Sequence, residues 1–105
     1  MVFLSIPTLE QLNTVRIHTM VDHLGMEFTG IGEDFLEATL PVDYRTIQPM
    51  GLLHGGANVV LAETLGSVGT HLHAGPNRII VGIDVNATHH KSATSGKVTA
   101  VATAV

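Results

Sequence analysis

Hydrophobic and polar residues alternate regularly along two stretches of this chain. Across residues 36–42 every second position is apolar, while Glu37, Thr39 and Pro41 fill the positions between. Across residues 78–88 the alternation is longer, and the apolar positions carry mainly isoleucine and valine. Because a period of two is typical of a half-buried β-strand, both stretches are predicted to be strands.

Two other stretches carry helical signals. Residues 54–73 are small and aliphatic with few charges, and they predict a long helix. Thr8 and Gln11 fit a capping box in front of a second predicted helix over residues 9–22. Gly25 is the expected stop of that helix. One side of it carries Leu12, Val15, Thr19 and Met20.

The rest of the pattern predicts strands, turns and loops. Residues 26–31 and 97–105 are predicted strands, and residues 32–34 a hairpin turn. Residues 43–53 and 89–96 read as loops. The order helix, two strands, long helix, two strands indicates one α+β domain over the whole chain, with an antiparallel sheet and one helix against it.

The long helix contains residues that are unusual in an apolar segment. Glu63 is costly there unless it is paired, hydrated or used in chemistry, although an exposed position would also explain it. Gly66 and Gly69 each cost roughly 1 kcal/mol relative to alanine in a helix interior. We therefore expect both glycines to pack closely against the sheet. Gly55 and Gly56 precede the apolar run and allow a close backbone approach.

Composition and charge exclude several classes of protein. Of the 105 residues 45% are hydrophobic and 13% are charged, so the chain is not disordered, and part of its surface is expected to be buried in an oligomer. The net charge of −4 argues against nucleic-acid binding. No cysteine is present, and the seven histidines form no metal-binding motif, so no metal site is expected. With no long apolar run and no convincing signal peptide, we expect a cytoplasmic protein that does not enter a membrane.

A resemblance to a known family covers nearly the whole chain. It is carried by the segments TMVDHLGMEF, LEATLPVDYRTIQPMGLLHGGANVVLAETLGS, IVGIDVNATHHK and SGKVTA. The chain resembles the hotdog-fold acyl-CoA thioesterases of the 4-hydroxybenzoyl-CoA thioesterase type, which include 1,4-dihydroxy-2-naphthoyl-CoA hydrolases and the thioesterases that proofread enterobactin synthesis. The resemblance implies a hotdog fold, in which a curved antiparallel sheet wraps around the long central helix.

The resemblance also implies hydrolysis of an aromatic or medium-chain acyl-CoA. It assigns Glu63 as general base or as nucleophile, and the Gly55 amide as the donor to the thioester oxygen. Amides at a helix start are unpaired and lie at the positive end of the helix dipole, which suits that task. Gln48 would bind the carbonyl or merely cap a turn. His54 would contact Gln48, the substrate or the helix start, and Ser67 would hold the water or the carboxylate or merely bond to its own backbone.

Five further residues are implied to meet the coenzyme A part of the substrate. His89, His90 and Lys91 would contact its phosphates, and Gly82 and Asn86 would line the path of the acyl group or pantetheine. The family often has an Arg-Pro pair beginning at the position of Lys91, and lysine cannot form arginine's bidentate phosphate contact. No separate cofactor is expected, because the CoA thioester is itself the substrate.

The spacing of the catalytic candidates predicts a partner chain. Gly55 and Glu63 lie eight residues apart, about 12 Å along a helix axis, so one chain cannot easily bring both to one carbonyl. In the family the two groups come from different subunits. We therefore expect an obligate homodimer, or a homotetramer of such dimers.

The family usually continues beyond the position of Val105, so a C-terminally truncated domain is expected, with two strands missing and a sheet edge uncovered. This leaves a second function open, a non-catalytic module for acyl-CoA binding or oligomerisation. A hotdog dehydratase is a lesser alternative, because those enzymes carry a different histidine and aspartate pattern.

Overall fold

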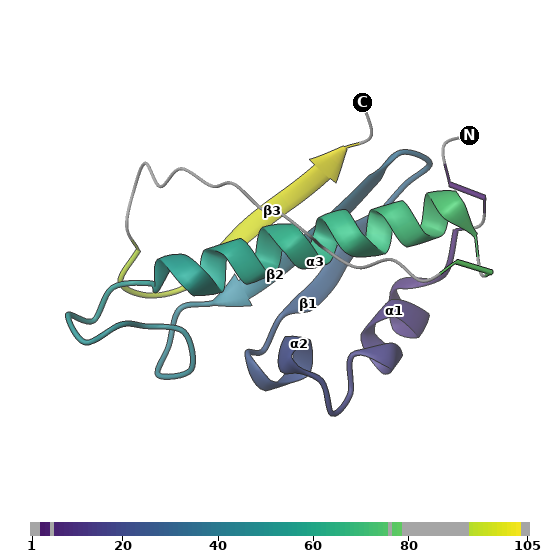
Figure 1. The fold of residues 1–105 in the computed structure, drawn as a ribbon. Coiled ribbons are helices and arrows are strands. Elements are labelled where there is room, and N and C mark those ends of the chain that lie inside the picture. Colours follow the sequence, from purple (N-terminus) through teal and green to yellow (C-terminus); the bar gives the residue numbers. More distant parts are fainter. Residues whose placement is uncertain (1–2, 5, 76, 79–92, 104–105) are drawn as a thin grey trace.

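The computed structural model describes residues 3–4, 6–75, 77–78 and 93–103. Its elements in chain order are α1 (Leu9–Val15), α2 (Met20–His23), β1 (Glu27–Ile31), β2 (Phe35–Pro41), α3 (Gly55–Ala74) and β3 (Lys97–Thr103) (Figure 1). The predicted order is confirmed over these ranges, except that the first helix is divided. The strand predicted over residues 78–88 lies almost wholly outside the described residues.

The N-terminal helix begins as predicted and ends early. The Thr8 hydroxyl accepts a hydrogen bond from the Gln11 amide at 3.1 Å, and the Gln11 side chain accepts one from the Thr8 amide at 2.9 Å. The capping box is therefore confirmed. The single helix predicted over residues 9–22 is wrong, because His18 has a φ of +63°, which a right-handed helix does not accommodate.

The break between α1 and α2 is held by its own contacts. Thr19 caps α2 by accepting a hydrogen bond from the Asp22 amide, and Arg16 pairs with the Asp22 carboxylate at 2.8 Å. The side chains of Val15 and Met20 are 75% and 61% exposed, so the apolar side predicted for one long helix does not form. The left-handed Gly25 ends α2 as predicted.

The sheet is antiparallel with the order β1-β2-β3. In the middle strand, Ala38 pairs with Phe28 of β1 on one side and with Ala100 of β3 on the other. Leu36, Ala38 and Leu40 are at most 1% exposed, so the alternation predicted for this strand is confirmed. Side chains at alternate positions of β2 thus form one apolar face of the sheet.

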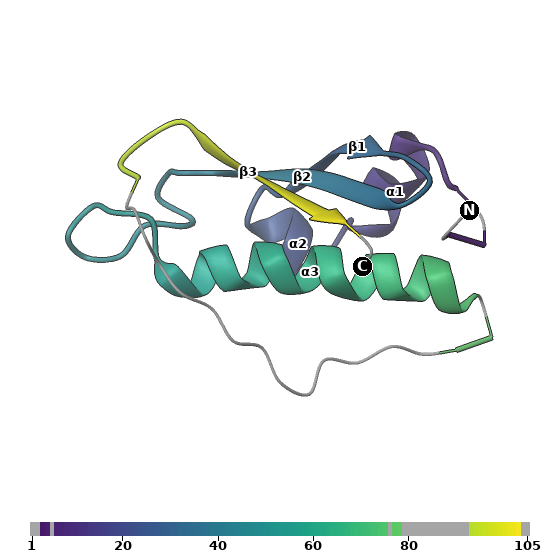
Figure 2. The same cartoon turned by 90° about the horizontal axis from the view of Figure 1, so that it is seen from above.

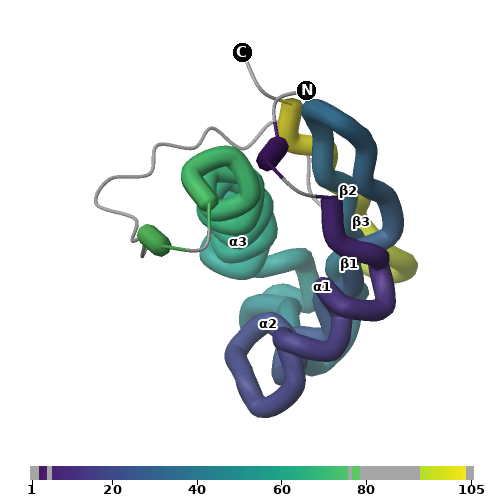
Figure 3. Tube along the Cα trace, turned by 90° about the vertical axis from the view of Figure 1, so that its right-hand side faces the viewer, coloured from purple at the N-terminus to yellow at the C-terminus, as the bar shows by residue number. Residues whose placement is uncertain are grey.

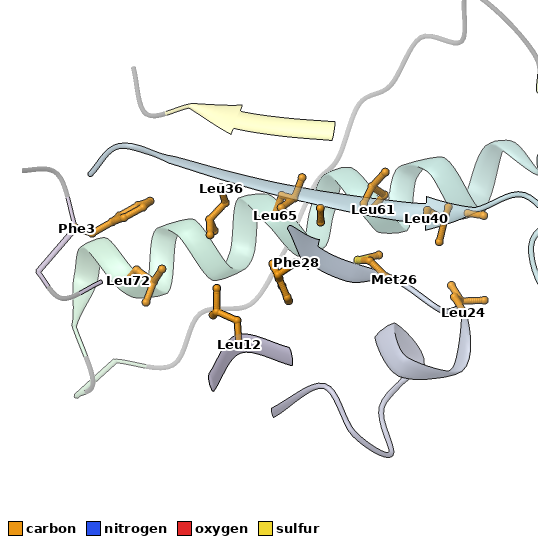
Figure 4. Packing of buried hydrophobic residues seen from close by; sticks show 12 residues of the cluster. Phe3, Leu12, Leu24, Met26, Phe28, Leu36, Leu40, Leu61, Leu65 and Leu72 are labelled. Atoms are coloured by element: carbon orange, nitrogen blue, oxygen red, sulfur yellow. The ribbon is translucent and has the colours of Figure 1, made fainter. Parts of the chain in front are cut away.

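Helix α3 lies along that apolar face as a second layer, and Figures 2 and 3 show the two layers from above and end-on. Leu61 and Leu65 of α3 are 1% exposed and point toward Leu36 and Leu40 of the sheet, as Figure 4 shows. Burying a side chain of this size stabilises the fold by about 1.5–3 kcal/mol. Contacts between the layers therefore fix α3 on the sheet.

The packing predicted for the helix glycines is wrong for Gly66. Gly66 is exposed, and a Cβ at this position would meet none of the described residues within 4 Å. A Cβ on Gly69 would lie 3.7 Å from the Leu36 side chain, which is an ordinary contact. Gly66 directly follows the buried Leu65 and is turned away from the sheet by about 100°, so the sheet does not require a glycine there.

Candidate active site

The segment before α3 folds back on itself as a short hairpin-like loop. Ile47 and Leu53 form an isolated antiparallel bridge, and the Gln48 amide donates to the Leu52 carbonyl at 2.8 Å. The Gln48 side-chain oxygen accepts a hydrogen bond from the Met50 amide. Its side-chain nitrogen makes no hydrogen bond to any described residue, so this amide keeps a donor for a ligand.

His54 caps the start of α3. Its backbone is extended, with φ −67° and ψ 130°, and its Nδ1 accepts a hydrogen bond from the Gly56 amide at 2.8 Å. The Gly55 amide has no acceptor among the described residues, as expected for the first residue of a helix. The helix start therefore offers the Gly55 N–H to a ligand, whereas the Gly56 N–H is already used within the chain.

Glu63 lies in the middle of α3 with its side chain exposed. The carboxylate makes no hydrogen bond or ion pair with any residue that the structure describes, so it is not a paired structural glutamate within these ranges. The position of Glu63 allows the carboxylate to meet water or a group from outside the chain.

Ser67 follows Glu63 by one helical turn and is half-buried. The Thr70 hydroxyl donates to the Gly66 carbonyl one turn back at 2.7 Å, which is a common habit of helical hydroxyls. The Ser67 hydroxyl makes no such bond to the described part of the chain. It therefore remains available on the same helix side as Glu63.

Hollows border α3 both before and after Glu63, and two of them are lined by a residue one helical turn away from it. The first has a volume of about 360 Å³ and borders the helix start, and its lining includes Thr46, His54 and Val60. The second has a volume of about 620 Å³, lies between α1 and α3, and its lining includes Ser67. Glu63 lines neither hollow, but Val60, three residues before it, lines the first, and Ser67, four residues after it, lines the second.

The second hollow is mainly apolar. Leu12, Val15, Phe28, Val68 and Leu72 supply its hydrocarbon surface, and Gln11, Ser67, His71 and Arg78 supply polar groups. Volumes of about 300–1,000 Å³ and apolar walls with a few polar groups are typical of small-molecule sites. The hollow therefore suits a small, mainly apolar ligand.

An ion pair between Asp43 and Arg45 stabilises the loop after β2, and Arg45 also lines the first hollow. Arg45 donates to the Asp43 carboxylate through Nη2 at 2.7 Å and through Nε at 3.1 Å. These side-chain bonds, together with one from the Arg45 amide, hold the pKa of Asp43 below its ordinary value. The same pair raises the pKa of Arg45. The guanidinium lies over Gly25, where a Cβ would be 2.6 Å from Nη1.

Thr46 is a residue that the sequence pattern did not single out. It is 2% exposed and is the only buried polar residue among those described. Its hydroxyl joins the end of β2 to the loop before α3. The available signal was Asp43 followed three residues later by threonine, which is typical of a side-chain-stabilised turn but does not indicate burial.

Five of the predicted site residues fall in a part of the chain that the structure does not describe. These residues are Gly82, Asn86, His89, His90 and Lys91.

Within the described ranges, no three histidine, aspartate or glutamate side chains gather closely enough to bind a metal ion. Among the helices that the structure describes, none has the length and apolar character needed to cross a membrane.

Comparison with known proteins gives consistent matches. The family described as the thioesterase superfamily matches residues 50–105. The proofreading thioesterase EntH of Cronobacter turicensis is 51% identical over 94 residues, which cover 90% of this chain and 69% of that protein.

Two solved structures superpose on nearly all of the chain. The thioesterase HI1161 from Haemophilus influenzae is 50% identical, with a TM-score of 0.94 over 98% of this chain and 72% of that one. A mutant of the thioesterase PA1618 from Pseudomonas aeruginosa is 45% identical, with a TM-score of 0.96 over 100% of this chain and 76% of that one.

Proposed function

The chain belongs to the thioesterase superfamily and has the predicted hotdog fold, and on this premise we propose that it hydrolyses an acyl-CoA thioester. Water adds to the thioester carbonyl, the carbon–sulfur bond breaks, and the products are a free acid and CoA. The acyl group is aromatic or of medium chain length. No separate cofactor is proposed, because the CoA thioester is itself the substrate and the groups named below supply the chemistry.

The observation that carries this proposal is the difference between the first two backbone amides of α3. His54 occupies the Gly56 amide at 2.8 Å, while the Gly55 amide has no acceptor in the described part of the chain. In the proposed reaction the Gly55 N–H donates to the thioester oxygen as negative charge develops there. One such donor is typically worth about 3–4 kcal/mol of activation free energy.

The Glu63 carboxylate is the general base or the nucleophile of the proposed mechanism. This carboxylate, which has no partner among the described residues, either removes a proton from the attacking water or attacks the carbonyl carbon itself. In the first route the proton passes to the departing thiolate. In the second route an anhydride forms, which water then hydrolyses. Ser67 binds the water or the carboxylate through its unoccupied hydroxyl, and the Gln48 side-chain nitrogen binds the carbonyl.

The acyl group is proposed to lie in the hollow between α1 and α3. The side chains of Leu12, Phe28 and Leu72 give it an apolar surface, and Ser67 borders it near Glu63. The CoA portion extends toward Gly82, Asn86, His89, His90 and Lys91, which are assigned by resemblance alone. A cytoplasmic location is likewise proposed from the sequence alone.

The proposed unit is a homodimer, which pairs further into a tetramer in one version of the proposal. Gly55 and Glu63 belong to one straight helix and are separated by about 12 Å along its axis. A thioester carbonyl in contact with the Gly55 amide of one chain would therefore meet Glu63 of the other chain. The exposed Glu63 carboxylate, without a partner in the part of the chain that the structure describes, supports this arrangement.

Hydrolysis of benzoyl-CoA, followed with a thiol reagent, tests the proposed activity. Glu63→Gln keeps the shape of the side chain and removes its charge, so kcat should fall by at least about 100-fold. Glu33→Gln, an exposed change in the turn between β1 and β2, is the matched control and should leave kcat unchanged. Activity should also survive chelation of divalent metals by EDTA.

Three results would contradict the proposal. A folded chain that binds CoA tightly without turnover would support the acyl-CoA-binding module instead. Conversion of a 3-hydroxyacyl-CoA to the enoyl product would support a dehydratase. Turnover that survives Glu63→Gln undiminished would remove Glu63 from the mechanism.

A further inference from the structure

We infer that Thr46 is a positioning residue of the active site, whose buried hydroxyl fixes the loop carrying Gln48 and the start of α3. The inference rests on the proposed function, because it concerns how the groups of that site are held. Thr46 touches no reacting atom in the proposed mechanism. It acts through the backbone that presents the Gly55 amide.

The Thr46 hydroxyl both donates a hydrogen bond to the surrounding backbone and accepts one from it. It donates to the Pro41 carbonyl at 2.6 Å and accepts from the Asp43 amide at 3.1 Å. Pro41 is the last residue of β2, so the first bond attaches the loop directly to the central strand of the sheet. With the side chain 2% exposed, water does not replace these bonds when the hydroxyl is removed.

The Thr46 backbone carries this attachment on to the helix. Its carbonyl accepts a hydrogen bond from the His54 amide at 2.8 Å, and its own amide donates to the Asp43 carbonyl at 2.9 Å. His54 then holds the Gly56 amide at 2.8 Å through Nδ1. A continuous series of bonds therefore runs from the sheet through Thr46 and His54 to the first turn of α3.

The same attachment closes the loop that contains Gln48. Residues 46 and 54 form the base of this loop, and the bridge between Ile47 and Leu53 forms its next rung. Both proposed donors to the carbonyl, the Gln48 side chain and the Gly55 amide, therefore depend on one base. Displacing such groups by about 1 Å can slow a reaction about 100-fold, because they act only in one geometry.

Two substitutions separate the hydroxyl from the shape of the side chain. Thr46→Val keeps the volume and removes the hydroxyl, whereas Thr46→Ser keeps the hydroxyl and removes a methyl group. We expect kcat for benzoyl-CoA to fall roughly 10- to 100-fold in Thr46→Val, with KM changed less than threefold, and to stay within about twofold of wild type in Thr46→Ser.

A core change elsewhere controls for general loss of stability. Leu36→Val removes a buried methylene near the start of β2, about 17 Å along the strand from Pro41. It should lower Tm and leave kcat unchanged below the unfolding transition. Equal loss of kcat in Leu36→Val and Thr46→Val would overturn the inference, and so would full kcat in Thr46→Val.

Amide hydrogen exchange gives a readout that does not depend on activity. The His54 amide should exchange faster in Thr46→Val and at the wild-type rate in Thr46→Ser. If the wild-type chain hydrolyses no thioester, the proposed function fails, and this exchange alone decides whether Thr46 holds the loop. If Thr46→Val does not fold, Thr46→Ser decides, because a loss of kcat in it would assign the role to the methyl group and overturn the inference.

Discussion

His54 Nδ1 accepts a hydrogen bond from the Gly56 amide at 2.8 Å, so the imidazole closes the first turn of α3. An acceptor at Nδ1 requires that the proton of the neutral ring be on Nε2. The second ring nitrogen is therefore left as a donor, and the side chain also borders the hollow at the helix start. One side chain thus both caps the helix and lines part of the neighbouring surface.

Replacing His54 should show how much its helix-capping hydrogen bond contributes to stability. His54→Asn retains a short side-chain acceptor suited to an N-cap, whereas His54→Ala retains none. We expect His54→Ala to lower the free energy of unfolding by about 1 kcal/mol, or roughly 4–8 °C in Tm, and His54→Asn to lower it by much less. Thermal unfolding followed by circular dichroism measures both. Equal Tm losses in the two variants would show that the cap is not the stabilising feature.

Two left-handed glycines form a matched pair for testing the Arg45 brace. Gly25 has φ +78° and Gly51 has φ +82°, so alanine at either position is strained by about 1–2 kcal/mol. A Cβ at Gly25 would also lie 2.6 Å from the Arg45 guanidinium, whereas one at Gly51 would meet nothing within 4 Å. Gly25→Ala should therefore lower Tm more than Gly51→Ala. The difference in Tm loss between the two variants should disappear when each change is made separately in an Arg45→Ala background.

The elements readable from the sequence are those that local contacts specify. The side chains of Thr8 and Gln11 each accept a hydrogen bond from the other residue's backbone amide, and Leu36 and Leu40 alternate with polar residues within one strand. Such signals need no knowledge of the rest of the fold. The same is true of the two glycines, Gly55 and Gly56, with which α3 begins.

The features that could not be predicted from the sequence depend on contacts between distant segments or on a single dihedral angle. The helix break rests on the left-handed His18 and on an ion pair that spans it, and neither has a periodic signature. Thr46 is buried only because β2 and the start of α3 close around it. Gly66 was misjudged because helix propensity alone does not say which side of α3 faces the sheet.

The Asp43 carboxylate should make stability depend on pH in acid. Its hydrogen bonds from Arg45 place its folded-state pKa below the ordinary 3.8. As pH falls, the unfolded chain therefore binds this proton first, and the stability contributed above that value is lost on passing below it. Tm measured from about pH 2 to pH 7 should show a wild-type advantage over Asp43→Asn that shrinks below about pH 4.

Asp34→Asn serves as the control for this pH series. Its side chain is exposed and forms no hydrogen bond or ion pair with the described residues. Its Tm should follow that of the wild type across the whole range. An NMR titration of the Asp43 carboxyl that gives an ordinary pKa would contradict the prediction directly.

The Gly55 amide can be removed without disturbing the helix start. Proline is favoured at the first position of a helix, and the extended His54, with φ −67° and ψ 130°, has the conformation that a residue before proline adopts. Gly55→Pro should therefore fold, and its kcat should fall about 100- to 1,000-fold through loss of one donor. Gly55→Ala keeps the N–H and is the control. Full activity in Gly55→Pro would exclude this amide as the oxyanion donor.

Mixing two inactive variants tests whether one site draws on two chains. In a dimer built as proposed, Gly55→Pro chains still supply Glu63, and Glu63→Gln chains still supply the Gly55 amide. Each mixed dimer then contains one intact site and one doubly damaged site. Random exchange of subunits makes half of the dimers mixed, so about a quarter of wild-type activity should return. If both groups act from one chain, the mixture stays inactive. Recovery that requires a cycle of unfolding and refolding would show in addition that the subunits do not exchange in the native state.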